Sequence, residues 1–413
     1  MARGPEDERT FLEAFLREFP APPGPGGPLP GKLRDARVAP DEVEGVLVEL
    51  ALTVLGSRDA PPRLAASLTR AAVDQLTPAD PAAEEPPEPD PDDRVLLEAG
   101  PLQARFLSKL WDVCRQWRAP GPPAAPGRPL PISVHAIRNS RRKMEDRHVA
   151  LPAFNQLFGL ADEPERAYLA VFDGHGGADA ADFAAAQLHV HLARHPDLGT
   201  DPAGALRAAF RLTDDMFLRK AKREGLRSGS TGVCALLAGP AVHVAWLGDS
   251  QVVLVRRGEA LTLMEPHRPE RQDEKERVEA LGGFVSYVDC WRVNGTLAVS
   301  RAIGDASQKP YVSGEADSAT RELSGSEDYL LLACDGFFDA VEPQEAAELV
   351  RRHLATSGGA EAGVAEGLVA AAREGGSGDN ITVLVAFLRD PRDLLAGGEP
   401  GEAPVVFPGP SPP

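Results

Sequence analysis

The sequence predicts a mixed domain of α-helices and β-strands that follows a small helical region. Short apolar, β-branched runs recur from Ile132 onward, which is typical of buried strands. Longer stretches with helical periodicity lie between these runs. Two Pro-rich segments, 78–93 and 119–131, separate the helical region from the mixed domain and predict linkers.

Residues 1–77 show helix signals. Apolar side chains repeat at helical spacing in two groups, and Gly56 is a plausible stop for the second. The groups are Phe11, Leu12, Phe15, Leu16 and Phe19, then Val43, Val46, Leu47, Leu50 and Val54. Residues 78–93 hold six prolines and seven acidic residues, which predicts a solvated linker that cannot pack. A further helix fits 94–118, with Phe106, Leu107, Leu110 and Trp111 on one side.

The mixed domain is expected to span residues 132–390. Its expected strands are Tyr168–Phe172, Ala241–Leu247, Gln251–Val255, Tyr329–Cys334 and Ile381–Leu388. Its expected helices are 178–195, 202–225, 269–281 and 343–354, the third of which ends at a Gly-Gly stop signal. Residues 391–413 are rich in Pro and Gly and predict a disordered tail.

Composition excludes several classes of function. A net charge of -18 over 413 residues disfavours binding to nucleic acid or anionic membranes. The four cysteines are far apart and match neither a disulfide framework nor a zinc pair, which indicates a reducing compartment. The acidic N-terminus does not resemble a signal peptide, and the most apolar run, Val46–Leu55, is too short to span a membrane. The expected location is the cytosol, with the nucleus as a second compartment.

Acidic residues stand at the ends or turns of four strand-like runs. The acids are Asp173, Asp249, Asp335 with Asp339, and Asp379. A carboxylate at a strand end is held rigidly yet faces open space, and a following glycine lets the backbone approach closely. Any one of these corners is more simply a tight turn with a solvated acid. Together they predict a site with oxygen ligands only, a chemistry that selects Mg²⁺ or Mn²⁺ over zinc.

Basic residues precede two further acids in Arg138–His148. Taken alone, this segment is more simply a charged loop or an edge strand. The functional interpretation assigns one arginine to a phosphate, because the planar guanidinium matches phosphate oxygens bidentately. No cysteine begins a C-x5-R phosphate loop, so a cysteine-phosphatase mechanism has no candidate nucleophile.

These segments resemble, in order, the motif series of the type 2C, metal-dependent protein phosphatases. The motifs are RRKMEDRH, VFDGHGG, GSTG, AWLGDS, RVNGTLAVSRAIGD, LLACDGFFD and GDNITV, between about Ile132 and Leu388. The resemblance implies an α+β fold with a central β-sandwich of two antiparallel sheets flanked by helices. The N-terminal segments FLREFP, VEGVLVELALTVLGSR and FLSKLWDV resemble one branch of this family, the calcium/calmodulin-dependent protein kinase phosphatases.

The resemblance implies a ligand set for two Mg²⁺ or Mn²⁺ ions, with a weaker third. Asp173 matches the aspartate that bridges both metals, and Asp335 and Asp379 match the other carboxylates on one of them. The carbonyl oxygen of Gly174 matches a ligand of the second metal ion. The acids implicated in the third site, together with Asp335, are Asp249 and Asp339.

The resemblance also assigns the catalytic groups. Glu145 and Asp146 correspond to acids that hold metal-bound waters, Arg141 to the phosphate-binding arginine, and His175 to the proposed general acid. Hydrolysis is then expected to proceed through a metal-bridged hydroxide, without a covalent phosphoenzyme. One departure lies after Asp305, where 306–309 replace the family's usual aromatic and lysine.

The implied function is hydrolysis of phosphoserine and phosphothreonine in proteins. The N-terminal resemblance implies calmodulin-dependent kinases as substrates, Rho-family exchange factors as partners, and roles in motility and apoptosis. The alternative is a catalytically inactive scaffold that uses the same fold for binding. Three further features favour structural roles: Arg301 as a loop anchor, Cys334 as a core residue, and 268–277 as a solvated helix face in preference to a substrate-facing flap.

Overall fold

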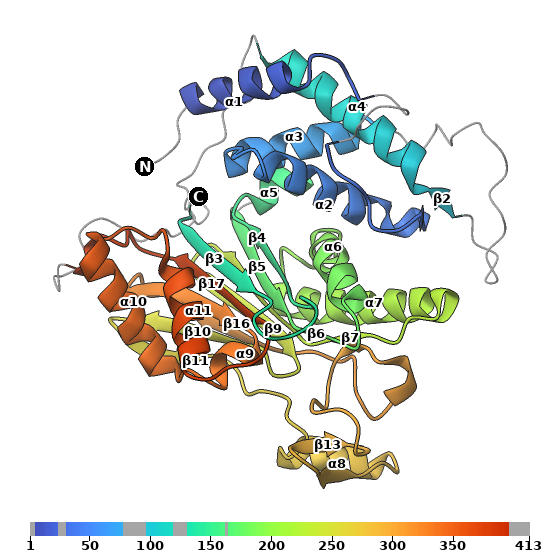
Figure 1. Ribbon diagram of the computed structural model, residues 1–413, viewed down its shortest axis with the longest axis vertical. Helices are drawn as coiled ribbons and strands as arrows, with labels where there is room; N and C mark the ends of the chain where they lie inside the picture. Colours follow the sequence, from blue (N-terminus) through green and yellow to red (C-terminus); the bar gives the residue numbers. More distant parts are fainter. Residues whose placement is uncertain (1–4, 24–29, 77–95, 119–129, 162–163, 396–413) are drawn as a thin grey trace. The chain divides into compact units, whose positions relative to one another are not determined.

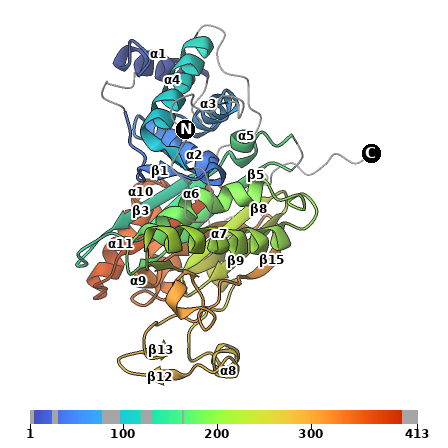
Figure 2. The ribbon, with the colours of Figure 1, turned by 90° about the vertical axis from the view of Figure 1, so that its right-hand side faces the viewer.

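The computed structural model describes residues 5–23, 30–76, 96–118, 130–161 and 164–395. The predicted linker 78–93, nearly all of the linker 119–131 and the tail from 396 lie outside these residues. The chain divides into two compact units (Figures 1 and 2). One comprises Met1–Pro129 with Leu151–Asp162, and the other comprises Leu130–Ala150 with Glu163–Pro413.

The first unit is helical. Its elements are α1 (Pro5–Glu18), β1 (Arg37–Val38), η1 (Pro40–Glu42), α2 (Val43–Gly56), α3 (Pro62–Asp74), β2 (Leu97–Glu98), α4 (Ala99–Trp117) and α5 (Phe154–Phe158). One apolar core joins the first four helices and includes Leu12, Leu47, Leu68 and Phe106. The helix expected from residue 94 begins only at Ala99, because Leu97 and Glu98 pair with β1 as a short strand.

The second unit contains two five-stranded sheets. The first has the order β11-β10-β16-β17-β3, and the second has the order β15-β9-β8-β5-β4. The first sheet is built from β3 (Ile132–Ile137), β10 (Gln251–Arg256), β11 (Glu259–Thr262), β16 (Glu327–Ala333) and β17 (Ile381–Phe387). The second is built from β4 (Arg147–Leu151), β5 (Arg166–Phe172), β8 (Gly232–Ala238), β9 (Ala241–Leu247) and β15 (Asp317–Glu322). The strand pairs within each sheet run antiparallel.

The two sheets pack face to face over a shared apolar core. Val171 and Val244 of the second sheet lie in the same cluster as Leu254, Leu332 and Leu384 of the first. The alternate residues of the first sheet, such as those at 331 and 333, face a second cluster on its outer side. Strand β16 is therefore buried on both faces, which explains why its sequence is a continuous apolar run.

Helices cover the outer faces of the sandwich (Figure 1). The outer cluster of the first sheet is completed by α9 (Asp335–Phe338), α10 (Pro343–Ser357) and α11 (Val364–Glu374). On the second sheet, α6 (Asp179–Ala193) packs against β5, and α7 (Pro202–Glu224) packs along β9 and β15. The expected sandwich of antiparallel sheets flanked by helices is confirmed.

Between β11 and β15 the chain leaves the two sheets (Figure 1). This excursion contains α8 (Gln272–Ala280), β12 (Val285–Tyr287), β13 (Trp291–Val293), β14 (Ile303–Gly304) and η2 (Ala306–Gln308). Strand β14 joins a small sheet with β7 (Gly229–Ser230) and β6 (Gly174–His175). No helix in the described part of the chain is long and apolar enough to cross a membrane.

Candidate metal and phosphate site

Three aspartates from three strand ends converge at one place. Asp173 follows β5, Asp249 follows β9 by two residues, and Asp335 follows β16 by two residues. Each offers a carboxylate oxygen, and these oxygens all lie within 4.8 Å of one another. Neighbouring antiparallel strands and the packing of the two sheets thus bring together acids that are far apart in the sequence.

Close backbone contacts fix these turns. The carbonyl oxygen of Asp173 accepts hydrogen bonds from Thr231 N at 2.9 Å and Ser230 Oγ at 3.1 Å. Gly248, directly before Asp249, has φ +92°, and a Cβ there would lie 2.5 Å from Thr231 Cβ. Only glycine fits this turn, because a side chain would be strained and would overlap Thr231. Thr231 of the GSTG motif therefore supports the site through packing and its backbone.

Burial and neighbouring acids raise the pKa values of the three carboxylates. Burial raises the pKa of Asp173 well above its usual range, and the charges of Asp335 and Asp146 raise it further. Burial also raises the pKa of Asp249, with a further increase from the charge of Asp335. Like charges held this close repel, so the protein alone leaves the cluster electrostatically unfavourable.

Asp146 lies beside this cluster. Burial raises its pKa to about 6, although its Oδ2 accepts a hydrogen bond from Thr382 Oγ1 at 2.7 Å. Cys334 is also close, but burial raises the pKa of its thiol well above the usual range. The thiol therefore stays protonated. Its sulfur accepts a hydrogen bond from the amide N–H of Thr382 at 3.2 Å. Cys334 also belongs to the apolar cluster between the sheets. Both observations support the interpretation of Cys334 as a core residue.

The unsatisfied oxygens fit divalent cations. Within the described part of the chain, Asp146 Oδ1 and Asp249 Oδ1 are buried and have no hydrogen-bond partner. A buried carboxylate oxygen without a partner is costly, and a hard cation would satisfy it and also offset the repulsion. The residues present therefore suit Mg²⁺ or Mn²⁺, with Asp173, Asp335 and Asp249 best placed to hold them.

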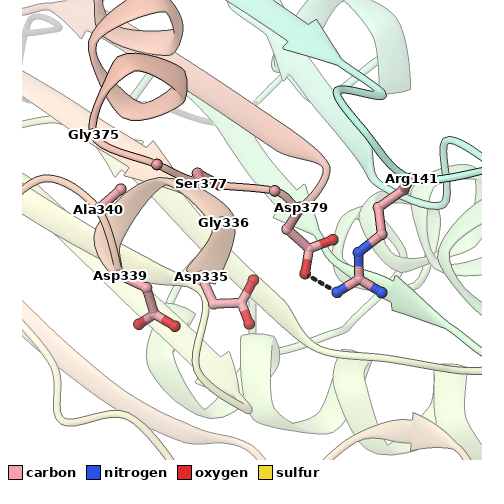
Figure 3. A pocket seen from close by; sticks show the side chains of 10 residues that line it. Arg141, Asp335, Gly336, Asp339, Ala340, Gly375, Ser377 and Asp379 are labelled. Carbon is pink, nitrogen blue, oxygen red and sulfur yellow. Dashed lines mark hydrogen bonds and ion pairs between the residues drawn. The ribbon is translucent and has the colours of Figure 1, made fainter.

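A cavity of about 450 Å³ opens beside Asp335 (Figure 3). Arg141, Asp335, Asp339 and Asp379 line it with the loop 375–378. The side chain of Arg141 is 61% exposed, and its Nη2 pairs with Asp379 Oδ2 at 2.5 Å. Arg141 therefore presents its other N–H groups to solvent in a pocket that also holds the acids.

Two predicted ligands are not in the cluster of three. Asp379 is paired with Arg141, although it shares the pocket with Asp335. The side chain of Asp339 is 62% exposed and pairs with Arg268 at 2.9 Å. Their roles as ligands stay predictions, as do the roles of the carbonyl of Gly174 and the side chain of Glu145.

The loop that carries Arg141 is joined by hydrogen bonds to the turn before β17, which carries Asp379. Asn380 Nδ2 donates to the carbonyls of Arg138 and Lys143, and its Oδ1 accepts the amide of Glu145 at 2.7 Å. Asn380 lies in the GDNITV motif, but its role in joining the two segments was not predicted. Its position next to an acid at a strand start was the available signal, since a buried asparagine needs several partners.

Removing these hydrogen bonds should loosen the phosphate pocket. Asn380→Ala loses three hydrogen bonds, so we expect about 2–4 kcal/mol less stability in chemical denaturation of the full chain. We also expect a higher KM for a phosphothreonine peptide, because Arg141 would no longer be held over the cavity. Asn380→Asp, which keeps the acceptor oxygen but turns a carboxylate oxygen toward the two carbonyls, should lose at least as much stability. An unchanged unfolding midpoint in the alanine variant would contradict this role of Asn380.

The excursion is anchored to the sheets by charged side chains. The buried carboxylate of Glu274 on α8 accepts from Arg301 at 2.6 Å and from Arg277 at 2.9 Å. Arg301 also pairs with Asp317 of β15 at 2.8 Å. These contacts support the structural interpretation of Arg301. Within 268–277, Glu270, Gln272, Asp273 and Glu276 are exposed, Pro269 and Glu274 are buried, and the other residues are partly exposed. The segment is therefore only in part the solvated helix face that was expected.

Comparison with known proteins places the chain among protein phosphatases. The family model "Protein phosphatase 2C" matches residues 131–381. The chain is similar to Protein phosphatase 1F of Homo sapiens, with 61% identity over 97% of this chain and 92% of that protein. It is also similar to Protein phosphatase 1E of Homo sapiens, with 52% identity over 89% of this chain and 49% of that protein.

Two solved structures share the fold. One is described as a C. elegans sex determining protein, with a TM-score of 0.75 and 24% identity over 96% of this chain and 97% of that chain. Another is a serine-threonine phosphatase 2C from Toxoplasma gondii, with a TM-score of 0.57 and 21% identity over 64% of this chain and 96% of that chain.

Proposed function

The chain belongs to the protein phosphatase 2C family, and we propose that it dephosphorylates calmodulin-dependent protein kinases at the site of clustered aspartates described above. As a member of this family it is a metal-dependent serine/threonine protein phosphatase. The observation that carries the proposed site is the convergence of Asp173, Asp249 and Asp335 next to a cavity lined by Arg141.

The residues of the cavity and of the neighbouring acidic cluster, together with His175, have complementary tasks in phosphate ester hydrolysis. Arg141 donates hydrogen bonds to phosphate oxygens from the N–H groups that do not contact Asp379. These bonds orient the phosphorus. Bound divalent cations supply positive charge for the phosphoryl oxygens and lower the pKa of water. Asp173 and Asp335 would hold these cations, and the buried Asp146 would orient water. His175 donates a proton to the departing serine or threonine oxygen.

The proposal extends to the metals. Two Mg²⁺ or Mn²⁺ ions are expected at Asp173, Asp335, Asp379 and the carbonyl of Gly174. A weaker third is expected near Asp249 and Asp339. The all-oxygen donor set and the protonated state of Cys334 support hard cations over zinc.

The kinase substrates rest on the likeness of the whole chain. The similarity to Protein phosphatase 1F extends over 97% of this chain and so includes the helical unit. That unit has its own apolar core, which suits a module for recognising a partner. We infer autophosphorylated calmodulin-dependent kinases as substrates, Rho-family exchange factors as partners, and activity in the cytosol and nucleus, with effects on motility and apoptosis.

Metal dependence tests the site. We expect the full chain to hydrolyse a phosphothreonine peptide with Mn²⁺ and to lose this activity in excess EDTA, because the aspartates alone cannot offset the charge of the phosphate. Re-addition of Mn²⁺ should restore the rate. Equal rates with Mn²⁺ and with EDTA would exclude the metal mechanism, and no hydrolysis under either condition would favour the inactive scaffold.

Substrate preference tests the kinase proposal separately. The rate on an autophosphorylated calmodulin-dependent kinase should exceed the rate on an unrelated phosphothreonine protein at equal concentration. Equal kcat/KM for both would remove the kinase proposal while leaving the phosphatase activity intact.

A further inference from the structure

His175, the residue expected to donate the proton, is held by an acid that the sequence analysis did not assign. Its Nε2 lies 2.7 Å from Asp305 Oδ2. The side chain of Asp305 is only 7% exposed, whereas that of His175 is 29% exposed. No hydrogen bond joins His175 Nδ1 to any residue that the structure describes.

The small sheet creates this pair. In the order β14-β7-β6, Gly229 lies opposite both His175 and Gly304. Asp305 directly follows Gly304, so both side chains reach across the same glycine. A Cβ at Gly229 would overlap Asp305 Oδ2 and His175 Nε2. The space for this contact therefore exists because residue 229 has no side chain.

The backbone of Asp305 is also held in place. Its φ of +48° is left-handed, a conformation that aspartate tolerates at a cost and that needs support from its surroundings. Asp305 N donates to the carbonyl of Ser228 at 3.2 Å. On the other side of the turn, the buried carboxylate of Asp214 accepts from Gly304 N at 2.7 Å and from Lys309 Nζ at 2.8 Å. The lysine that follows the inserted residues 306–308 thus supports the turn.

We propose that Asp305 is the positioning residue for His175 and that Nδ1 is the atom that delivers the proton. This inference rests on the proposed function. A carboxylate facing Nε2 accepts a hydrogen bond from its N–H. This nitrogen therefore keeps a proton, and the ring cannot rotate freely. Nδ1, which has no hydrogen-bond partner among the described residues, is then the nitrogen left for the substrate.

In the hydrolysis step, each bond that breaks is matched by a bond that forms. The oxygen of water forms a bond to phosphorus and releases a proton to solvent, while the bond from phosphorus to the serine or threonine oxygen breaks. The departing oxygen takes the proton from His175 Nδ1, and the ring becomes neutral with its Nε2–H still facing Asp305. Solvent protonates Nδ1 again before the next turnover. Asp305 itself neither gains nor loses a proton.

The test compares Asp305→Asn with wild type on two substrates in the full chain with Mn²⁺. Asparagine keeps the shape, but its amide can donate as well as accept, so it no longer fixes which ring nitrogen carries the proton. We expect kcat on a phosphothreonine peptide to fall about 10- to 100-fold, because its poor leaving group needs protonation. We expect kcat on p-nitrophenyl phosphate to fall much less, because its leaving group departs as a stable anion. A general loosening of the fold would lower both rates alike.

Two further variants separate positioning from folding. In a His175→Ala background, Asp305→Asn should give no further loss, because the residue acts only through the ring. Asp214 is a buried carboxylate on α7 that supports the same turn but does not touch His175, so Asp214→Asn should lower stability without changing the ratio of the two rates. Equal losses on both substrates, or an additional loss in the His175→Ala background, would overturn the proposal. Wild type that fails to hydrolyse the peptide would instead overturn the proposed function.

Discussion

Asp335→Asn should lower kcat on a phosphothreonine peptide roughly a thousand-fold or more and leave the protein folded. The change removes one ligand oxygen and one negative charge from the cluster with Asp173 and Asp249. It removes no apolar contact, because the side chain faces the cavity and not either core. Steady-state kinetics with saturating Mn²⁺ would measure the loss.

Thermal unfolding provides a readout apart from activity. A cation at 100 times its Kd stabilises a folded protein by about 2.7 kcal/mol, so Mn²⁺ should raise the Tm of wild type and raise that of Asp335→Asn less. In EDTA the variant should be at least as stable as wild type, because one of the mutually repelling carboxylates is gone. The exposed Asp215 on α7 supplies a matched control, and Asp215→Asn should behave as wild type. Normal turnover in Asp335→Asn would mean that this ligand is misassigned.

His175→Ala should slow hydrolysis of the phosphothreonine peptide roughly 10²–10⁴-fold. The loss on p-nitrophenyl phosphate should be much smaller, since this ester needs no proton on its leaving oxygen. The ratio of the two kcat values therefore reports the proton transfer itself. His353→Ala on α10, where the ring contacts the carbonyl of Ala362, serves as the control and should change neither rate. A uniform loss on both esters would argue against an acid role for His175.

The acids of the site could be predicted because each stands at the end of a recognisable strand. An apolar run that stops at an aspartate, as at Asp173 and Asp335, is a local signal that needs no knowledge of the fold. The five predicted strands in 168–388 are confirmed with small shifts at their ends. Strand β8 was missed, because a short apolar run such as 232–238 reads equally as buried helix or strand.

Contacts between distant side chains could not be predicted in the same way. Asp305 reaches His175 across 130 residues only because β14 and β6 flank the same glycine. Asn380 meets Glu145 across 235 residues through the pairing of β17 with β3. Periodicity carries no information about such pairings, which arise from sheet register. Similarly, nothing in 151–162 indicated that this segment groups with the helical unit.

The clustered aspartates of the site project from strand ends, whereas two apolar clusters of the second unit lie within and behind its sheets. Chemistry and shape are therefore encoded by separate sets of residues. Substitutions at the acids would escape cellular quality control, which removes unfolded chains and not inactive ones. A mutational scan scored by protein abundance would accept such variants, while a scan scored by dephosphorylation would reject them, and the difference between the two maps would outline the site.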